Sequence, residues 1–296
     1  MSSLKICFKI LIVFFVFQLL IQPSHAIKIG LLNSVTETII GTNVAGVITD
    51  RRTNAVLFKT EKMAAYKIRP YQGILSIEIK GQNYKLKTNS IILRIAEPNG
   101  FVFTKKRWYR GELIITNYNG FLQVINKVPL EEYIMGVVPS EMPSKWNFEA
   151  HRAQAIAARS YALSNLGKRA NKGYDLTDTP QDQAYRGASA ETNQTNLAVR
   201  STEGIVMTYN NKIISAYYHS SSGGHTVQSG EVWAKNLPYL KSVDGYDWGK
   251  KKFGHGVGMS QYGANNLAGM GYGGFQILNH FYNNVSFAKV KNPNLY

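Results

Sequence analysis

The sequence predicts an α+β fold: a β-rich N-terminal module followed by a mixed α/β core with an Ala-rich helix beside a cleft. Short runs of alternating apolar and polar residues, separated by turn residues, occupy residues 27–126. An Ala-rich segment with an apolar stripe of helical period follows at residues 147–165, and β-runs and glycine-rich loops come after it. Strand and helix periodicities in different parts of one chain are typical of this fold class.

Length and composition indicate a packed protein. The chain has 296 residues, of which 44% are hydrophobic and 12% aromatic, enough for one large domain or two ordinary ones. We expect a leader at residues 1–26, the β-rich module at residues 27–126 and the core at residues 127–296. Within the β-rich module the clearest strands are residues 74–79, 91–95 and 113–116.

The first 26 residues have the pattern of a secretory signal peptide. Lys5 and Lys9 flank an apolar run at residues 10–21, and small residues precede a predicted cleavage after Ala26. An uncleaved membrane anchor is the alternative, although the run is short for a spanning helix. Either way, the pattern predicts an exported protein of the cell envelope, in the periplasm or on the extracellular face, with a possible membrane tether through this segment.

Cysteine content and charge exclude several kinds of protein. Cys7 is the single cysteine and lies in the leader, so the exported part would have neither disulfides nor thiolate metal ligands. The net charge of +16 predicts association with anionic polymers or lipid head groups. Because the basic residues are scattered and accompany no nucleic-acid-binding motif, we expect anionic envelope material and not nucleic acid as the partner.

Glu141 is the carboxylate that the local sequence places most narrowly. Pro139 and Pro143 flank it, and their fixed φ predicts a rigid turn that presents Glu141 at the mouth of the following helix. A lone carboxylate on such a turn suits a single acid/base. The alternative is that Glu141 only places negative charge in the first turn of that helix, where the helix dipole favours it.

The Ala-rich helix is predicted to pack in the core. Phe148, Ala155 and Ala158 share one stripe, and small side chains would let neighbouring backbones approach closely enough to build a cleft. Gln154 and Arg159 are the polar members that could face this cleft, whereas solvated positions on the outer face are the alternative. A second predicted feature is a hairpin at residues 204–218, with Asn-Asn as its turn.

Three of the six histidines lie in glycine-rich loops: His219, His225 and His255. One interpretation is a histidine metal site with Glu141 as base beside an activated water. The His-x5-His spacing matches no recognised zinc signature. The structural alternative is that these rings hydrogen-bond to loop backbones.

A serine nucleophile is the other catalytic interpretation. Ser220, Ser221 or Ser260 could act with a nearby histidine as base. The sequence around Ser260 lacks the second glycine of a Gly-x-Ser-x-Gly elbow, which disfavours an acyl-transfer hydrolase.

Five stretches between residues 127 and 282 resemble one family, the sporulation stage II protein D family, also called the amidase-enhancer or LytB family, of bacterial cell-wall proteins. The matching stretches, in the family's order, are residues 128–133, 136–143, 154–162, 218–224 and 254–261. The resemblance implies a peptidoglycan lytic transglycosylase that cuts between N-acetylmuramic acid and N-acetylglucosamine. The Glu of its Glu-Met-Pro motif would be the acid/base, which corresponds to Glu141.

A lone carboxylate is sufficient for that reaction. It protonates the leaving glycosidic oxygen and then takes the proton of the muramic C6 hydroxyl, which closes a 1,6-anhydro ring. The local sequence patterns and the resemblance together predict which residues bind the glycan. These residues are Gln154, Arg159, His219, Ser220, Ser221, His255, Ser260 and Gln261. No cofactor is expected.

Two departures from the family pattern matter. Where some members carry zinc-binding cysteines and a histidine, residues 177–182 read Thr-Asp-Thr-Pro-Gln-Asp, so no metal is expected. Where many members have several tens of residues, only residues 245–253 precede the Gly-His-Gly loop, which predicts a missing subdomain and an altered cleft. Two rival functions remain: a non-catalytic peptidoglycan binder that enhances an N-acetylmuramoyl-L-alanine amidase, and a purely structural envelope protein.

Overall fold

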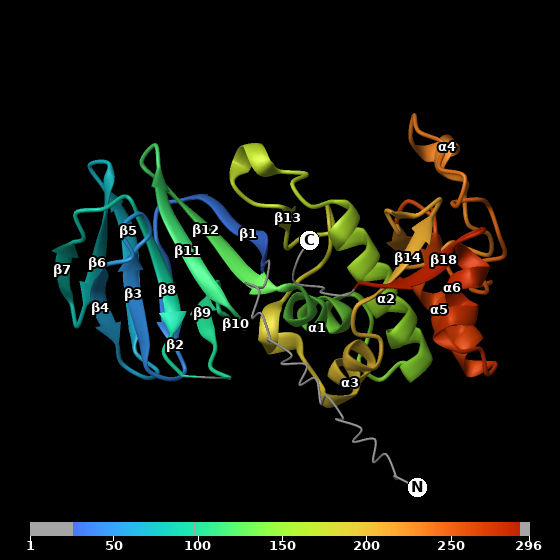
Figure 1. Ribbon diagram of the computed structural model, residues 1–296, viewed down its shortest axis with the longest axis horizontal. Helices are drawn as coiled ribbons and strands as arrows, with labels where there is room; N and C mark the ends of the chain where they lie inside the picture. The colour runs from blue at the N-terminus through green and yellow to red at the C-terminus, as the bar shows by residue number, and fades with distance from the viewer. Residues whose placement is uncertain (1–25, 98, 291–296) are drawn as a thin grey trace, which may run out of the picture.

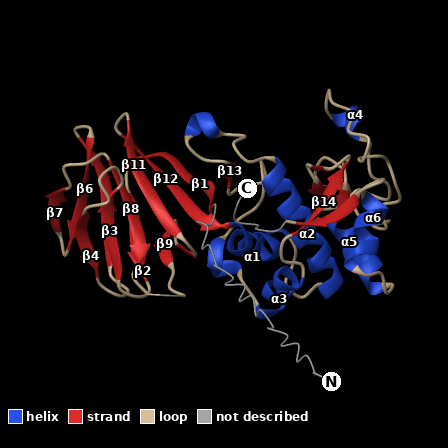
Figure 2. Ribbon diagram, in the orientation of Figure 1, coloured by secondary structure: helices blue, strands red, loops and turns tan. Residues whose placement is uncertain are grey.

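The computed structural model describes residues 26–97 and 99–290 (Figure 1). All but the last residue of the predicted leader lies outside this range. Strands dominate the N-terminal half and helices gather in the C-terminal half (Figure 2), which confirms the predicted α+β class. Within the described residues, no helix combines the length and apolar character that crossing a membrane requires.

Two β-sheets form the N-terminal module. The larger sheet has, in spatial order, β13 (Leu176–Thr177), β1 (Ala26–Val35), β12 (Phe121–Pro129), β11 (Glu112–Tyr118), β8 (Ser90–Ile95), β3 (Gly46–Asp50) and β4 (Val56–Thr60). The smaller sheet has β10 (Arg107–Tyr109), β9 (Val102–Thr104), β2 (Thr38–Thr42), β5 (Ala65–Tyr71), β6 (Ile74–Ile79) and β7 (Gln82–Lys85). The strand predicted at residues 74–79 is β6, and the other two predicted strands lie inside β8 and β11.

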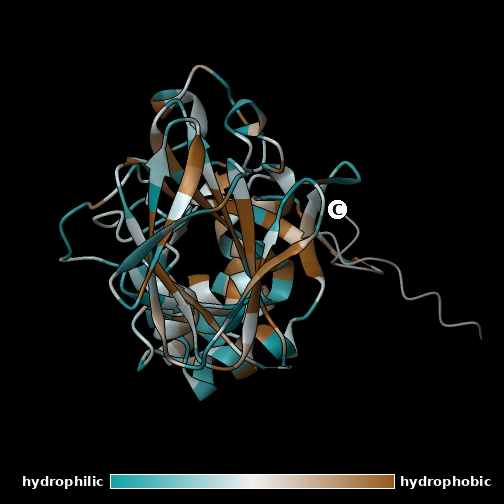
Figure 3. Cartoon of the chain, turned by 90° about the vertical axis from the view of Figure 1, so that its left-hand side faces the viewer, coloured by the Kyte–Doolittle hydropathy of each residue, from teal (hydrophilic) through white to brown (hydrophobic). Residues whose placement is uncertain are grey.

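Alternating side chains explain why the sheets pack face to face. Ile91 and Leu93 of β8 are fully buried in the main core, which residues of both sheets share, and Ile92 between them points to the opposite face. There Ile92 packs with Ile114 under the ring of Tyr174. Figure 3 views the molecule from the side of the N-terminal module. Hydrophobic and polar residues alternate along its strands, which lie in front of the helices.

The module and the core are continuous. Residue 127, where the sequence suggests a boundary, lies inside β12, which leads directly into the first helix. Strand β13 belongs by sequence to the core, yet it pairs in parallel with β1, with Ile29 opposite Leu176. The main hydrophobic cluster likewise includes residues of both parts. The module is therefore a firm support for one side of the core.

Helix α2 (Phe148–Ser164) is the centre of the core. It contacts α1 (Leu130–Glu141), α3 (Asn193–Ser201), α5 (Gln261–Gly269) and α6 (Gly274–Phe281). Its alanines face two separate hydrophobic clusters: Ala155 lies in one, and Ala153 and Ala157 lie in the other. The helix begins after Asn147, whose side chain accepts from the N–H of Glu149. The predicted packing role of this helix is confirmed.

The remaining elements bring the two histidine loops together. The predicted hairpin exists as β14 (Ile205–Tyr209) and β15 (Lys212–Ile213), with Asn210 and Asn211 at φ of 49° and 60° in its turn. The second strand has only two residues, after which the chain continues to β16 (Tyr218–His219). Strand β16 pairs in parallel with β17 (Met259–Ser260), with Tyr218 opposite Met259 and His219 opposite Ser260. Strand β18 (Ser286–Lys289) completes the sheet on the other side of β14, and the short helix α4 (Ser229–Val232) lies above.

Candidate active site

Glu141 lies at the end of a helix, not in the predicted turn before the next one. Helix α1 continues through Pro139 and ends at Glu141 itself. The hydroxyl of Ser140 donates to the carbonyl of Gly136 in the preceding turn (2.6 Å). A carboxylate at a helix C-terminus faces the negative end of the helix dipole. This placement is the reverse of the favourable first-turn position, so the alternative of a merely stabilising charge is wrong.

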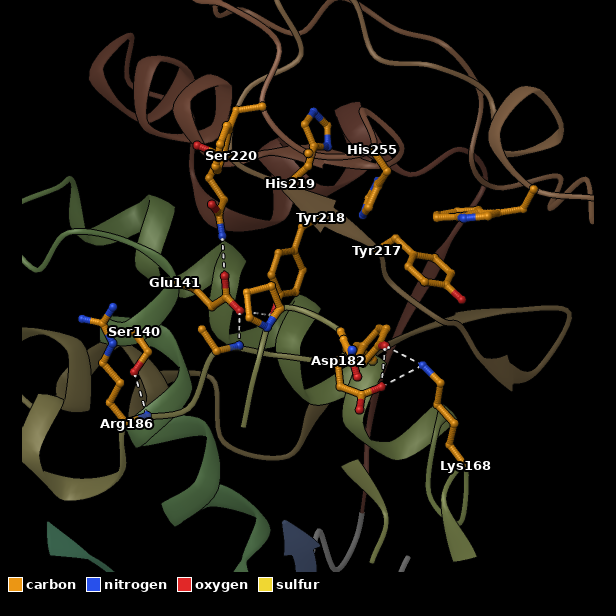
Figure 4. Close-up of a pocket in the computed structure, with 18 residues that line it drawn as sticks. Ser140, Glu141, Lys168, Asp182, Arg186, Tyr217, Tyr218, His219, Ser220 and His255 are labelled. Carbon is orange, nitrogen blue, oxygen red and sulfur yellow. Dashed lines mark hydrogen bonds and ion pairs between the residues drawn. The ribbon is translucent and has the colours of Figure 1, made fainter. Parts of the chain in front are cut away.

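The Glu141 side chain enters a cavity of about 640 Å³ between two walls (Figure 4). One wall comes from the end of α1 and the loop that carries Asp182, Ala184 and Arg186. The other comes from β16, the Gly-His-Gly loop and the start of α5. Of the predicted site residues, five line the cavity: Glu141, His219, Ser220, His255 and Gln261. The fold thus brings together residues up to 120 positions apart.

Three groups donate hydrogen bonds to the Glu141 carboxyl. The N–H of Ala184 donates to Oε1 (2.6 Å), Gln261 Nε2 donates to Oε2 (3.2 Å), and the Tyr218 hydroxyl lies 3.4 Å from Oε1. Burial raises the pKa of Glu141 above its usual value, although these three hydrogen bonds oppose the shift. The buried carboxyl therefore keeps its proton more readily than a solvent-exposed glutamate does. The three donors nevertheless stabilise its ionised form.

Asp182 is the other carboxylate among the cavity's described lining residues. Lys168 and Arg169 each donate to it over 2.8 Å, and the Thr177 hydroxyl donates over 2.9 Å. Burial alone would raise the pKa of Asp182, but these interactions lower it to about 2. Asp182 is thus held in its ionised form, whereas the pKa of Glu141 is raised, so Glu141 is the cavity carboxyl better suited to exchange a proton.

The two histidines of the cavity are neutral and close together, with ring centroids 5.6 Å apart. Burial lowers the pKa of His219 to about 4, with a further contribution from His255, and burial likewise lowers the pKa of His255 to about 4. Nδ1 of His219 contacts the carbonyl of Val257 (3.2 Å), which assigns its proton to Nδ1. Nε2 of His219 is buried and has no partner among the described residues. It is available as an acceptor for a hydroxyl or amide of a ligand.

Gly254 allows the Gly-His-Gly loop to approach His219. Its φ of +102° is disfavoured for residues with a side chain, and a Cβ there would lie 2.9 Å from the Cβ of His219. The glycine-rich composition of this loop thus has a local steric reason. It lets the backbone of the loop form part of the cavity wall.

Two predicted residues on α2 do not reach the cavity. Arg159 is fully buried, and its guanidinium forms a two-pronged ion pair with Glu131 (both contacts 2.7 Å). Gln154 is also fully buried, and neither its Oε1 nor its Nε2 has a partner among the described residues. The prediction that both face the cleft is wrong because α2 is enclosed on all sides, so its polar side chains point into the interior.

Two predicted serines are structural. Ser260 is fully buried, accepts from the N–H of Gly263 as the N-cap of α5, and donates to Asp247 (2.6 Å). Ser221 is buried and donates to the carbonyl of Lys251 (2.7 Å). Their predicted contact with substrate is therefore wrong. Neither hydroxyl bonds to a histidine, so the serine-nucleophile interpretation finds no support at these positions.

The described residues contain no group of three or more His, Cys, Asp or Glu side chains arranged to bind a metal ion. His225, the third histidine of the metal interpretation, does not line the cavity and packs its ring against Trp248 at 4.9 Å. The metal interpretation therefore lacks a ligand set in this part of the chain.

Several residues around Glu141 were not predicted from the sequence. Tyr218 and Ala184 line the cavity and contact Glu141, and the buried Gln183 donates to the Tyr218 hydroxyl (2.9 Å). Tyr218 directly precedes His219 in one of the stretches that resemble the family, and this adjacency is the signal that the sequence contains. Ala184 acts through its backbone N–H, which no residue pattern reveals.

The comparison with known families identifies part of the chain. Residues 118–209 match the family described as Stage II sporulation protein. The match makes this segment of the chain similar to that family. It contains β12, α1 with Glu141, α2 and β14, and it ends before the histidine loops. The predicted family resemblance is thereby confirmed.

Named relatives agree with the family match. Stage II sporulation protein D of Bacillus subtilis is 41% identical over 144 residues, which are 44% of this chain and 42% of that protein. The amidase enhancer of the same organism is 44% identical over 107 residues, 36% of this chain and 14% of that protein. Stage II sporulation protein D of Bacillus amyloliquefaciens is 28% identical over 261 residues, 56% of this chain and 76% of that protein. The chain thus spans less than half the length of the first two relatives.

Proposed function

We propose that this Stage II sporulation protein relative is an exported peptidoglycan lytic transglycosylase with Glu141 as its single acid/base. The observation that carries the proposal is the isolation of Glu141. Among the described residues it is the cavity carboxyl that forms no ion pair, burial raises its pKa, and three donors surround its oxygens. These are the properties that a proton-exchanging carboxyl needs.

The proposed reaction needs one carboxyl and no water. Protonated Glu141 donates its proton to the glycosidic oxygen as the bond from C1 of N-acetylmuramic acid to that oxygen breaks. The resulting carboxylate then takes the proton of the C6 hydroxyl, whose oxygen forms the new bond to C1. Between these steps, the donors from Ala184, Gln261 and Tyr218 stabilise the transient negative charge. Glu141 ends as it began, protonated.

The test is an analysis of muropeptides released from purified peptidoglycan. We expect 1,6-anhydromuramic products from the wild-type protein, and a loss of roughly 10²–10⁴-fold in Glu141→Gln. Glu132→Gln is the matched control, because Glu132 lies on the same helix α1, has a pKa also raised by burial and does not line the cavity. Product release that persists in Glu141→Gln would remove Glu141 from the mechanism.

The second candidate is a non-catalytic peptidoglycan binder that enhances an N-acetylmuramoyl-L-alanine amidase. The 44% identity with the amidase enhancer of Bacillus subtilis favours it. On this alternative, anhydro products would be missing from digests with wild-type protein. Addition of the protein would instead speed release of stem peptides by a separate amidase, and Glu141→Gln would leave that effect intact.

A further inference from the structure

The segment at residues 245–253, where the sequence suggested a missing subdomain, is a firmly anchored loop at the cavity mouth. Asp247 is fully buried and accepts from the N–H and hydroxyl of Ser222, the N–H of Gly224 and the hydroxyl of Ser260. At its other end, Phe253 exchanges two backbone hydrogen bonds with Ser221 (2.9 and 3.3 Å). The loop is therefore held at both ends by backbone and carboxylate contacts.

This anchored loop presents aromatic side chains to solvent. Trp248 is 63% exposed and Phe253 is 73% exposed, although both belong to a loop whose backbone is fixed. Phe253 is also one of the residues that line the Glu141 cavity, as is the next residue, Gly254. An exposed aromatic ring contributes little to folding, so its position at the rim of a cavity is better explained by contact with a ligand.

Three consecutive lysines accompany these rings. Lys250, Lys251 and Lys252 are all exposed, and within the described residues none of them forms an ion pair. Lys250 lies over the ring of Tyr262 at 4.6 Å. Nζ of Lys252 lies against the Gly-His-Gly loop, 3.0 Å from the position that a Cβ of Gly256 would take. The rim thus carries three uncompensated positive charges beside an apolar ring.

We propose that the loop at residues 245–253 is an outer binding site for the glycan strand whose cleavage is proposed above. The Phe253 ring would stack on the apolar face of a sugar outside the Glu141 cavity, and the lysines would bind carboxylates of the strand, on its lactyl groups or stem peptides. A strand is favoured over a lipid surface because Phe253 is continuous with the cavity, so one extended polymer can contact Glu141 and the loop together.

The proposal is tested by binding to purified sacculi in the Glu141→Gln background, which separates binding from cleavage. We compare Phe253→Ala with Phe121→Ala, a 47% exposed phenylalanine on the N-terminal module. We also compare Lys250→Gln/Lys251→Gln/Lys252→Gln with Lys59→Gln/Lys62→Gln/Lys87→Gln, three exposed lysines of that module with the same change of net charge.

We expect Phe253→Ala to weaken sacculus binding roughly three- to tenfold, and the loop lysine variant to reduce both the affinity and its dependence on salt. The two controls should bind like the parent. Because the altered side chains are exposed, urea unfolding should be unchanged. Binding of the loop variants that equals that of the controls would overturn the proposal.

A lipid surface is distinguished by a parallel measurement with vesicles of phosphatidylglycerol and phosphatidylcholine. If the loop variants lose binding to these vesicles and keep binding to sacculi, the loop is a membrane contact and the proposal is overturned. Failure of the catalytic proposal would appear separately, as wild-type protein that binds sacculi through the loop without releasing anhydro products.

Discussion

The backbone N–H of Ala184 donates a 2.6 Å hydrogen bond to Oε1 of Glu141, 43 residues earlier in the chain. This contact joins the two elements of one cavity wall, the end of α1 and the loop that carries Ala184, and it orients the carboxyl. A backbone donor cannot rotate away as a side chain can, so the direction of Glu141 is set by the fold.

Replacement of Glu141 by Gln should change how stability depends on pH. Because burial raises the pKa of Glu141 in the folded protein above 4.5, the folded state binds more protons than the unfolded state in this range. The free energy of unfolding of the wild type therefore falls as pH rises from about 4.5 through the raised pKa. Glu141→Gln lacks this loss, so its stability relative to the wild type should increase over that window.

Urea unfolding at pH 4, 5.5, 7 and 8.5 measures this difference. Glu231→Gln is the control, since Glu231 is exposed and its replacement should give a curve parallel to the wild type. A curve for Glu141→Gln that also runs parallel would show that Glu141 does not retain its proton on folding.

Replacement of Tyr218 by Phe should move the pH profile of cleavage. The Tyr218 hydroxyl favours the ionised form of Glu141, so its removal raises the pKa of this carboxyl further. The acid needed for the first step would then persist to higher pH, and the alkaline fall of the rate should shift upward. Tyr217→Phe is the control, because Tyr217 lines the same cavity and its hydroxyl is not bonded to Glu141. An unshifted profile in Tyr218→Phe would contradict the assigned contact.

Replacement of His219 by Asn should protect the protein from acid. Burial lowers the pKa of His219 to about 4, so between pH 6.5 and 4 the unfolded chain binds the proton and the folded protein does not. This costs the wild type about 3 kcal/mol of stability as pH falls through that window. Asn can still donate to the carbonyl of Val257 and carries no charge. His225→Asn, at an exposed histidine, should leave the acid slope unchanged, and an unaltered slope in His219→Asn would refute the prediction.

Replacement of Arg159 by Met should unfold the core more easily without acting through the cleft. The change leaves the carboxylate of Glu131 partly buried and unpaired, and we expect a loss of about 3–5 kcal/mol in the free energy of unfolding. Adding Glu131→Gln should recover much of this loss. If Arg159→Met were fully stable and only weakened glycan binding, the sequence-based assignment of Arg159 to the cleft would be right after all.

The sequence predicted those elements whose structure follows from a local residue pattern. The alternation of residues 74–79 is a half-buried strand in any antiparallel sheet, and the alanines of α2 are suited to close packing wherever the helix lies. The sequence-based prediction misplaced Glu141 relative to its helix. Two flanking prolines are compatible with a turn, but they are also compatible with the end of a helix, where Pro139 lies inside the last turn of α1 and Pro143 lies beyond it. Arg159 and Ser260 looked like site residues since polar side chains in a matched motif can bind either a ligand or the protein itself.

By itself the sequence determined the α+β class, the central helix, the family resemblance of residues 118–209 and the candidacy of Glu141, because periodicity and short motifs are local properties of the chain. Only the tertiary structure decided which residues surround Glu141. The donors from Ala184, Gln261 and Tyr218 come from segments up to 120 residues away, brought together by the parallel pairing of β16 and β17 and by the burial of α2. Burial and backbone donors set the proton affinity of a carboxyl, and neither exists until the chain has folded.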